Sequence, residues 1–225
     1  MEVRFGIRYG NEKVVFELQS FNIVFWDFDG VIKESVDVKT EAYVQLFKPF
    51  GLEVAERVRE HHEINGGMSR FDKFPLYLGW AGISPTESSV MAYCAKFSDT
   101  VKQAVIESPW VAGVERVLQS KGPHQKYVLV SATPQAELEF ILRQLKLTKN
   151  FFLIFGAPVK KSDAIAETLK LNHVDPKLCL MIGDALADMT AAEANQVPFL
   201  LRRHAGNAAI FTDYSKSSIE DFSNV

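Results

Sequence analysis

The hydrophobic positions of this chain change their period several times, and each period predicts a different element. Between Val3 and Tyr9 apolar residues alternate with polar ones, and after Gly10-Asn11 the stretch Val14–Leu18 is again largely apolar. This pattern predicts two short strands joined by a tight turn. The next run, Phe21–Trp26, is almost continuously apolar, as in a strand buried on both faces of a parallel sheet.

Helical spacing replaces strand spacing from about Glu34 to Glu107. Three stretches in this segment repeat their apolar residues with helical period, namely Thr40–Phe50, Ala55–Ile64 and Val90–Ile106. Pro109 and Gly113 then interrupt the helical pattern. We therefore expect an α-helical cap of residues 34–106, inserted into a core that residues 1–33 and 107–225 form.

The rest of the chain alternates between strand and helix patterns. We expect strands at Tyr127–Val130, Phe151–Phe155, Leu178–Ile182 and Pro198–Leu201, with helices at Pro134–Leu145, at Asp163–Leu171 and up to about Asn195. Asn195 occupies the place of a left-handed helix stop. This order predicts right-handed crossovers and a parallel sheet. The expected fold class is α/β, a Rossmann-like parallel-sheet core with an inserted helical cap and an N-terminal β-hairpin extension.

Composition and charge narrow the class of function. The chain has 225 residues, of which 47% are hydrophobic, and a formal net charge of −3, which gives no indication of nucleic acid or an anionic membrane as a partner. No apolar run reaches membrane-spanning length, and residues 1–20 lack the apolar core of a signal peptide. Cys94 and Cys179 lie in apolar contexts, as buried free thiols do. We therefore expect a cytoplasmic protein, either a monomer or a homodimer.

Two carboxylates follow the first core strand. Asp27 and Asp29 are two residues apart, so in extended chain both side chains point to the same side, and Gly30 then ends the run. Ligands of open α/β sheets bind at the carboxyl edge, and two like charges this close need a cation or a shared proton. A helix cap with a turn is the alternative, but it leaves the spacing unexplained.

Three further groups follow other predicted strands. Ser131 ends one strand and precedes Ala132, Thr133 and Pro134, where Thr133 as a helix cap would leave backbone N–H groups free to bind an anion. Lys160 and Lys161 lie between a strand and a helix, and Asp184 and Asp188 follow an apolar strand and Gly183. Taken alone, the serine also fits a simple strand-to-helix turn, and Asp188 also fits an ordinary acid at a helix N-terminus.

These four pieces, in this order, resemble the motifs of the haloacid dehalogenase superfamily, and most specifically its helical-cap phosphatases, the phosphoglycolate phosphatase and β-phosphoglucomutase-like group. DFDGV, which begins at Asp27, resembles the first motif. The resemblance implies that Asp27 is the nucleophile and Asp29 the acid and base. It implies that Ser131 binds the transferred phosphoryl group together with Gly30, Ala132 and Thr133. The family lysine usually lies closer to the glycine than either candidate here, so Lys161 is our first choice and Lys160 our second.

The resemblance also implies a metal site and a cap contact. Mg²⁺ would bind the carboxylates of Asp27 and Asp184 and the backbone carbonyl of Asp29, with Asp188 acting through water or by orientation. In the cap, Gly66–Phe71 resembles a G-x-S-R loop in which the arginine meets a distal phosphate of the substrate, which would make Arg70 a substrate-binding residue. A surface arginine at a helix start is the alternative.

The function expected from this resemblance is a Mg²⁺-dependent phosphatase that hydrolyses a small phosphorylated metabolite through an aspartyl-phosphate. A phosphomutase of the β-phosphoglucomutase type needs the same motifs, and Arg70 keeps that alternative open. A dehalogenase needs neither Asp29 nor Asp184. A phosphate-binding or receiver-like signalling module is the non-enzymatic alternative, and the inserted cap argues against it.

Overall fold

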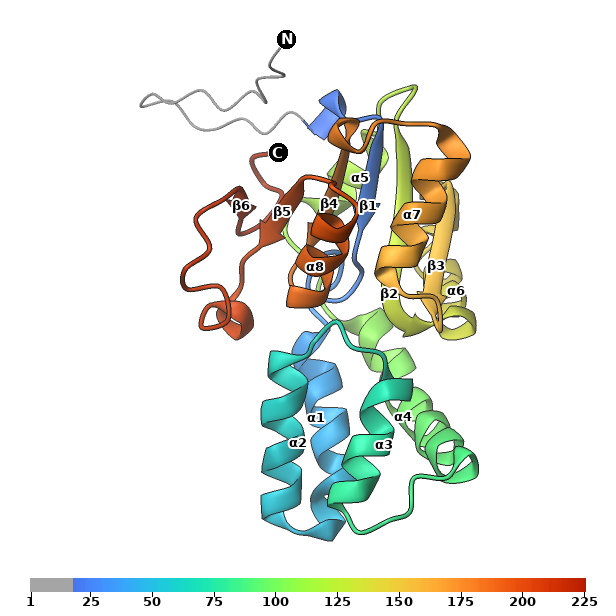
Figure 1. Cartoon of the computed structure of the whole chain (residues 1–225), viewed down its shortest axis with the longest axis vertical. Helices are drawn as coiled ribbons and strands as arrows, with labels where there is room; N and C mark the ends of the chain where they lie inside the picture. The colour runs from blue at the N-terminus through green and yellow to red at the C-terminus, as the bar shows by residue number, and fades with distance from the viewer. Residues whose placement is uncertain (1–17) are drawn as a thin grey trace.

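The core is a six-stranded sheet in which every neighbouring pair of strands is parallel (Figure 1). The computed structural model describes residues 18–225, so the predicted hairpin of Val3–Leu18 lies outside the described residues except for Leu18. The strand order is β3-β2-β1-β4-β5-β6. The strands are β1 (Ile23–Trp26), β2 (Lys126–Pro134), β3 (Leu153–Ala157), β4 (Cys179–Gly183), β5 (Phe199–Arg202) and β6 (Ser218–Ile219). The predicted α/β fold with a parallel sheet is therefore confirmed.

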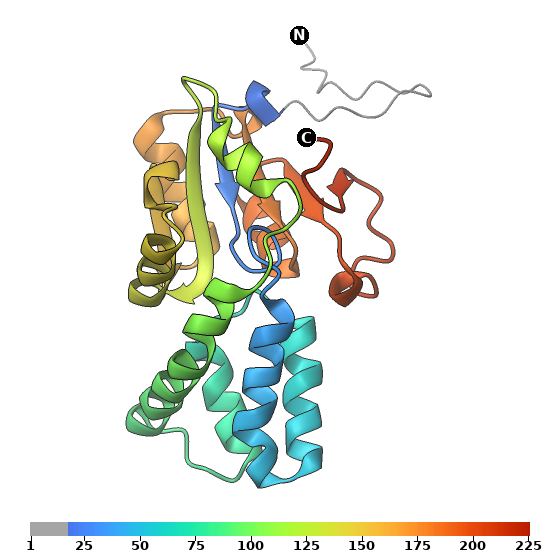
Figure 2. The same cartoon turned by 180° about the vertical axis from the view of Figure 1, so that it is seen from behind.

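Helices cover both faces of this sheet, as the two opposite views show (Figures 1 and 2). They are α5 (Val114–Gln119) and α6 (Gln135–Gln144) on one face, and α7 (Lys161–Asn172) and α8 (Leu186–Ala194) on the other. Strand β1 is buried throughout and sends Val24 and Trp26 into one apolar cluster and Ile23 and Phe25 into the other. The continuous apolar run at the first core strand thus reflects a strand with no solvent-facing side.

Four helices form a separate unit beyond the carboxyl ends of the strands (Figure 1). They are α1 (Val36–Phe47), α2 (Leu52–Ile64), α3 (Arg70–Trp80) and α4 (Glu87–Glu107). Aromatic rings fill its interior, where Tyr43 lies against Phe74, Tyr77 and Phe97 with ring centroids 4.0–5.5 Å apart. The helical stretch expected as an insertion therefore packs around its own aromatic core and also faces the sheet edge.

Five short 3₁₀ helices complete the described chain: η1 (Leu18–Ser20), η2 (Lys48–Phe50), η3 (Thr148–Asn150), η4 (Pro176–Leu178) and η5 (Ala205–Asn207). Among residues 18–225, no helix is long and apolar enough to span a lipid bilayer.

Several predicted boundaries were wrong for identifiable reasons. The helix expected to reach Phe50 ends at Phe47 and continues as a 3₁₀ turn, because Pro49 has no N–H to donate. Helix α3 was not among the predicted helical stretches, although one alternative had a helix start at Arg70. Pro75 lies inside this helix, and Ser69 caps its start by accepting a hydrogen bond from the Phe71 N–H. The left-handed residue after α8 is Gln196, one position beyond the predicted Asn195.

One buried ion pair joins the helical unit to the core. Arg70, the first residue of α3, donates to both carboxylate oxygens of Glu137 on α6, at 2.6 and 2.9 Å. Both side chains are buried, and the Ser98 hydroxyl of α4 donates to the same carboxylate at 2.5 Å. Removing either partner of such a buried bidentate pair leaves the other charge buried without compensation, which destabilises the fold.

We predict that Glu137→Gln destabilises the protein by about 3–5 kcal/mol, because it leaves the Arg70 charge buried without its partner. Urea denaturation followed by circular dichroism measures this loss. Adding Arg70→Met to Glu137→Gln should recover part of the loss, since the unpaired charge is then removed.

The matched control is Glu139→Gln on the same helix, whose pair with Arg143 is longer, at 3.9 Å, and solvent-exposed. We expect this control to change the free energy of unfolding by less than about 0.5 kcal/mol. A loss at Glu137→Gln no larger than that of the control would contradict the interpretation.

Candidate active site

Three carboxylates converge where the two central strands end. Asp27 directly follows β1, Asp184 directly follows β4, and Asp188 lies in the first turn of α8. Strands β1 and β4 are neighbours, and the Asp27 N–H donates to the Ile182 carbonyl at 3.0 Å. Oxygen atoms of Asp27, Asp184 and Asp188 all lie within 4.8 Å of one another, and all three residues are buried. Parallel pairing thus brings together acids that are about 160 positions apart in the chain.

Lys161 lies against this acidic cluster. Its ammonium is 2.9 Å from Asp27 Oδ1 and 2.6 Å from Asp188 Oδ1, and the side chain is only 7% exposed. Burial lowers the pKa of Lys161, but the charges of Asp188 and Asp27 outweigh it and hold the net pKa above the usual value. Lys160, in contrast, is exposed and precedes the first residue of α7. Of the two candidate lysines, the structure brings only Lys161 into contact with the acids.

The acids together carry more negative charge than Lys161 offsets. Burial raises the pKa of Asp27 to about 7, the nearby charge of Asp188 adds to this rise, and Lys161 opposes it. Burial likewise raises the pKa of Asp184 and of Asp188. Hard cations such as Mg²⁺ prefer oxygen ligands, and several buried carboxylates close together supply such ligands and gain from a positive charge between them. The residues of the acidic cluster therefore fit a magnesium ion.

Glycines make this close approach possible. A Cβ atom at Gly30 would lie 2.2 Å from Asp184 Oδ2, and one at Gly183 would lie 2.2 Å from the Asp188 Cβ. Gly30 also has a φ of +74°, a left-handed conformation that favours glycine. These two glycines therefore leave the room that the acids occupy.

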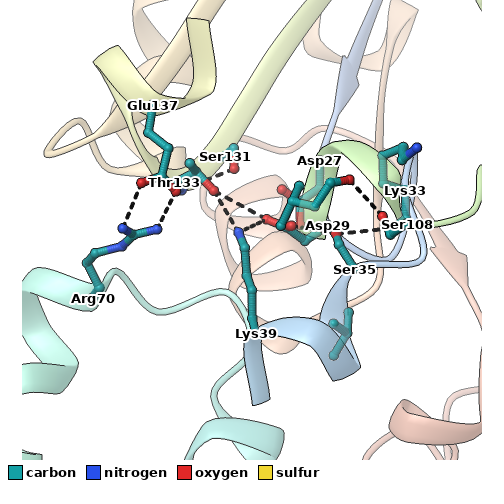
Figure 3. A network of polar contacts seen from close by, with 12 residues as sticks. Asp27, Asp29, Lys33, Ser35, Lys39, Arg70, Ser108, Ser131, Thr133 and Glu137 are labelled. Atoms are coloured by element: carbon teal, nitrogen blue, oxygen red, sulfur yellow. Dashed lines mark hydrogen bonds and ion pairs between the residues drawn. The ribbon is translucent and has the colours of Figure 1, made fainter. Parts of the chain in front are cut away.

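Asp29 belongs to a different network, on the side of the cap (Figure 3). Its carboxylate accepts hydrogen bonds from Ser35 Oγ at 2.6 Å and from Lys39 Nζ at 2.5 Å. Burial raises the pKa of Asp29, but the charge and hydrogen bond of Lys39 outweigh it, so the net pKa lies below the usual value. Because the side chain points to Lys39, only the backbone of Asp29 remains for the predicted metal site.

The predicted cap at Thr133 was wrong, because β2 continues to Pro134 and Pro134 itself precedes α6. Thr133 instead accepts a hydrogen bond from Lys39 at 2.8 Å and donates one to Asp29 at 3.3 Å. Ser131 is buried, and its hydroxyl accepts a hydrogen bond from the Thr133 N–H at 3.1 Å. Ala132 and Thr133 line the same cavity as Asp27, whereas Ser131 lines an adjoining one with Lys161.

Arg70 lines the cavity over Asp27, but its guanidinium is already engaged by Glu137 (Figure 3). The alternative of a surface arginine is wrong, since the residue is 3% exposed. Arg70 does begin a helix, as that alternative had it. The expectation that Arg70 presents a free guanidinium to an anion has to be revised, because Glu137 neutralises it.

Several polar residues at the site were not predicted. They are Ser35, Lys39, His62, Lys73, Glu137, His204 and Asn207. His204 Nε2 lies 2.9 Å from Asp184 Oδ2, and the Asn207 amide donates to the Asp184 backbone carbonyl at 2.8 Å. None of these residues directly follows a core strand in a recognisable motif. Lys39 lies in the first turn of α1, one residue before the predicted helical stretch, so helical spacing does not indicate that it reaches Asp29.

The cavity between cap and core measures about 40 Å³. That is room for about three water molecules. Its walls include Asp27, Asp29, Lys161 and Asp184 from the core, and Lys39, His62, Arg70 and Lys73 from the helical unit. A larger adjoining cavity of about 510 Å³ shares Gly67, Met68, Ala132 and Lys161 with this one, so the space beside Asp27 continues along the boundary between cap and core.

Comparison with known proteins agrees with this architecture. A putative phosphoglycolate phosphatase from Lactobacillus plantarum is similar in structure, with 16% identity and a TM-score of 0.68 over 90% of this chain and 96% of its own. β-Phosphoglucomutase from Clostridium difficile is 18% identical, with a TM-score of 0.71 over 91% of this chain and 93% of its own. CbbY from Rhodobacter sphaeroides, solved in complex with phosphate, is 14% identical, with a TM-score of 0.72 over 90% of this chain and 95% of its own.

These solved structures share the fold, and no curated protein sequence matches the chain. The model of the haloacid dehalogenase-like hydrolases matches residues 24–201. This range contains β4, all of β1 except Ile23, the helical unit and all three acids of the cluster. The chain therefore belongs to the haloacid dehalogenase-like hydrolases.

Proposed function

We propose that this protein is a Mg²⁺-dependent phosphatase that hydrolyses a small phosphomonoester through an aspartyl-phosphate on Asp27. The observation that carries the proposal is the contact of Lys161 with both Asp27 and Asp188, beside Asp184, below the cavity between cap and core. A carboxylate that is buried yet held by an ammonium can act as a nucleophile without bulk water nearby. The phosphatase and mutase names among the structural neighbours agree with this chemistry.

In the first step, a carboxylate oxygen of Asp27 attacks phosphorus, and the bond from phosphorus to the ester oxygen breaks. Asp29 gives its proton to the leaving alcohol. In the second step, Asp29 takes a proton from water, the resulting hydroxide attacks phosphorus, and inorganic phosphate leaves with the Asp27 carboxylate restored. Lys39 stabilises the ionised form of Asp29, which is the form that the second step needs. The first step needs the protonated form, which the negative charge of a bound phosphate ester would favour by raising the pKa of Asp29.

Other residues of the chain would hold the transferred phosphoryl group. We assign this binding to Lys161, the Ser131 hydroxyl and the backbone N–H of Ala132. The N–H groups of Gly30 and Thr133, which the resemblance also implied, already donate to the Lys33 carbonyl and to the Ser131 hydroxyl. Asp27, Asp184 and the Asp29 carbonyl would hold Mg²⁺, with Asp188 orienting Lys161 beside it. The ion would offset charge on the phosphoryl oxygens.

The alternatives have less support. Pairing of Arg70 with Glu137 removes the free guanidinium that kept a phosphomutase open. A receiver-like module needs its aspartate open to a phosphate donor, whereas Asp27 is 4% exposed. The partner that we propose is a small phosphorylated metabolite, and a cytoplasmic location and a monomer or homodimer remain predictions.

The experiment that tests the proposed function is turnover of p-nitrophenyl phosphate by two variants. Asp27→Asn should lower kcat by more than about 10³-fold, because an amide cannot replace the nucleophile. Asp29→Asn should lower kcat by about 10²–10⁴-fold, the usual contribution of a general acid and base. If the wild type hydrolyses the ester and Asp27→Asn hydrolyses it equally fast, the assignment of Asp27 as the nucleophile is refuted.

We predict that MgCl₂ raises the thermal unfolding midpoint of the protein, because an ion bound only to the folded state stabilises it. Differential scanning calorimetry over a MgCl₂ series gives the shift. Asp184→Asn should lose most of the shift, since it removes a carboxylate of the acidic cluster. Asp163→Asn, at an exposed acid of α7, is the matched control and should keep it. An equal shift in Asp184→Asn and the wild type would place the ion elsewhere.

The two adjacent lysines should differ sharply. Lys161→Ala should lower kcat by about 10²-fold or more, as loss of a charge that stabilises the transition state does. Lys160→Ala should stay within about threefold of the wild type, because its side chain is exposed. Near-ultraviolet circular dichroism checks that both variants fold. The reverse order of activities would move the role to Lys160.

A further inference from the structure

Four groups that can carry positive charge face the acids from the helical unit. They are Lys39 of α1, His62 of α2, and Arg70 and Lys73 of α3, and all of them line the cavity with Asp27 and Asp29. Each of the four residues is at most 9% exposed. The cap side of the cavity therefore carries basic groups, opposite the acidic cluster of the core.

Two of these cations already have an anionic partner. Lys39 pairs with Asp29 at 2.5 Å, and Arg70 pairs with Glu137 at 2.6 Å. Both pairs cross from the helical unit to the core. They leave neither cation free to neutralise a further anion.

Lys73 has no such partner. Within residues 18–225, no carboxylate lies within ion-pair distance of its ammonium, which instead contacts His62 Nδ1 at 2.6 Å. The ring of Tyr43 is the other close feature, with its centroid 5.6 Å away. Lys73 is 1% exposed, so bulk water does not solvate it. A buried ammonium without an anion is costly, and an anion that enters the cavity relieves that cost.

The pKa values of Lys73 and His62 also favour an anion at this place. Burial and the neighbouring charge of Lys39 lower the pKa of Lys73 well below its usual value, and burial and Lys73 do the same to the pKa of His62. The surroundings of this pair thus disfavour positive charge as long as the cavity holds no anion. An anionic group beside Lys73 and His62 reverses that preference.

The position of the pair fits a substrate group. Lys73 lies three residues after Arg70, so both side chains fall on the face of α3 that turns to the cavity. Asp27 lies on the core side of the same cavity. A substrate whose phosphorus is next to Asp27 therefore extends its leaving group toward the helical unit.

We propose that Lys73 and His62 form a subsite for a second anionic group, a carboxylate or a phosphate, on the leaving-group side of the substrate. This inference rests on the proposed phosphatase function. The subsite takes the place in the cavity that the sequence motif suggested for Arg70. It would select phosphate esters that carry a second anionic group over esters of similar size that carry only the reacting phosphate.

Steady-state kinetics on matched esters test the subsite. One arm compares 2-phosphoglycolate with ethyl phosphate, which lacks the carboxylate, and the other compares glucose 1,6-bisphosphate with glucose 1-phosphate. The quantity measured is the ratio of kcat/KM for the doubly anionic member to kcat/KM for the other. We expect this ratio to exceed one in the wild type for at least one pair. Lys73→Met should lower it about ten- to a hundredfold, the usual worth of a charge-assisted hydrogen bond.

Three further variants separate binding from a structural role. Lys73→Arg should keep most of the ratio, because it keeps the charge. His62→Asn should lower the ratio in the same arm as Lys73→Met, and it serves if Lys73→Met fails to fold. Lys96→Met, at an exposed lysine of α4, is the matched control and should leave the ratio unchanged.

An unchanged ratio in Lys73→Met, or equal losses on both members of each pair, would overturn the subsite while leaving the phosphatase standing. A wild type that hydrolyses no ester at all would instead overturn the phosphatase and the subsite with it. The arm whose ratio falls tells whether the anion is a carboxylate or a phosphate.

Discussion

The contact of Lys161 with Asp27 and Asp188 is the interaction on which the rest of the site depends. Three buried carboxylates lie within 4.8 Å of one another at the end of the two central strands, and they repel one another in a medium of low dielectric. One ammonium holds two of them, and the third, Asp184, contacts His204. The proposed nucleophile and the proposed metal site both follow from this arrangement.

Charge is divided between the two sides of the cavity. The core supplies the acidic cluster, and the helical unit supplies Lys39, Arg70 and Lys73. Lys39 pairs with Asp29, and Arg70 pairs with Glu137. Both pairs join the helical unit to the core, and the first of them also orients Asp29. Moving the helical unit away from the core would separate both pairs. The proposed second anionic group of the substrate would instead contact Lys73 and His62, which no core carboxylate holds among the described residues.

Much of the fold could be predicted from the sequence, because buried parallel strands and amphipathic helices leave regular patterns. Asp27 and Asp184 were predictable as a pair, since each directly follows a strand of the same sheet edge. Lys39 and Lys73 were not predictable, because only the packing of the helical unit against the core brings them to Asp29 and His62. Arg70 shows the same limit: the motif located it at the cavity, but Glu137, which neutralises it, lies 67 positions away.

The proposed mechanism requires a covalent bond between Asp27 and phosphorus. Intact-protein mass spectrometry of acid-quenched reactions, followed by peptide mapping, tests it most directly. We expect an added mass of one PO₃ group on the peptide that contains Asp27 in the wild type, and none in Asp27→Asn. A phosphoryl group found on another residue, or turnover without any protein-bound phosphate in rapid-quench samples, would contradict the account.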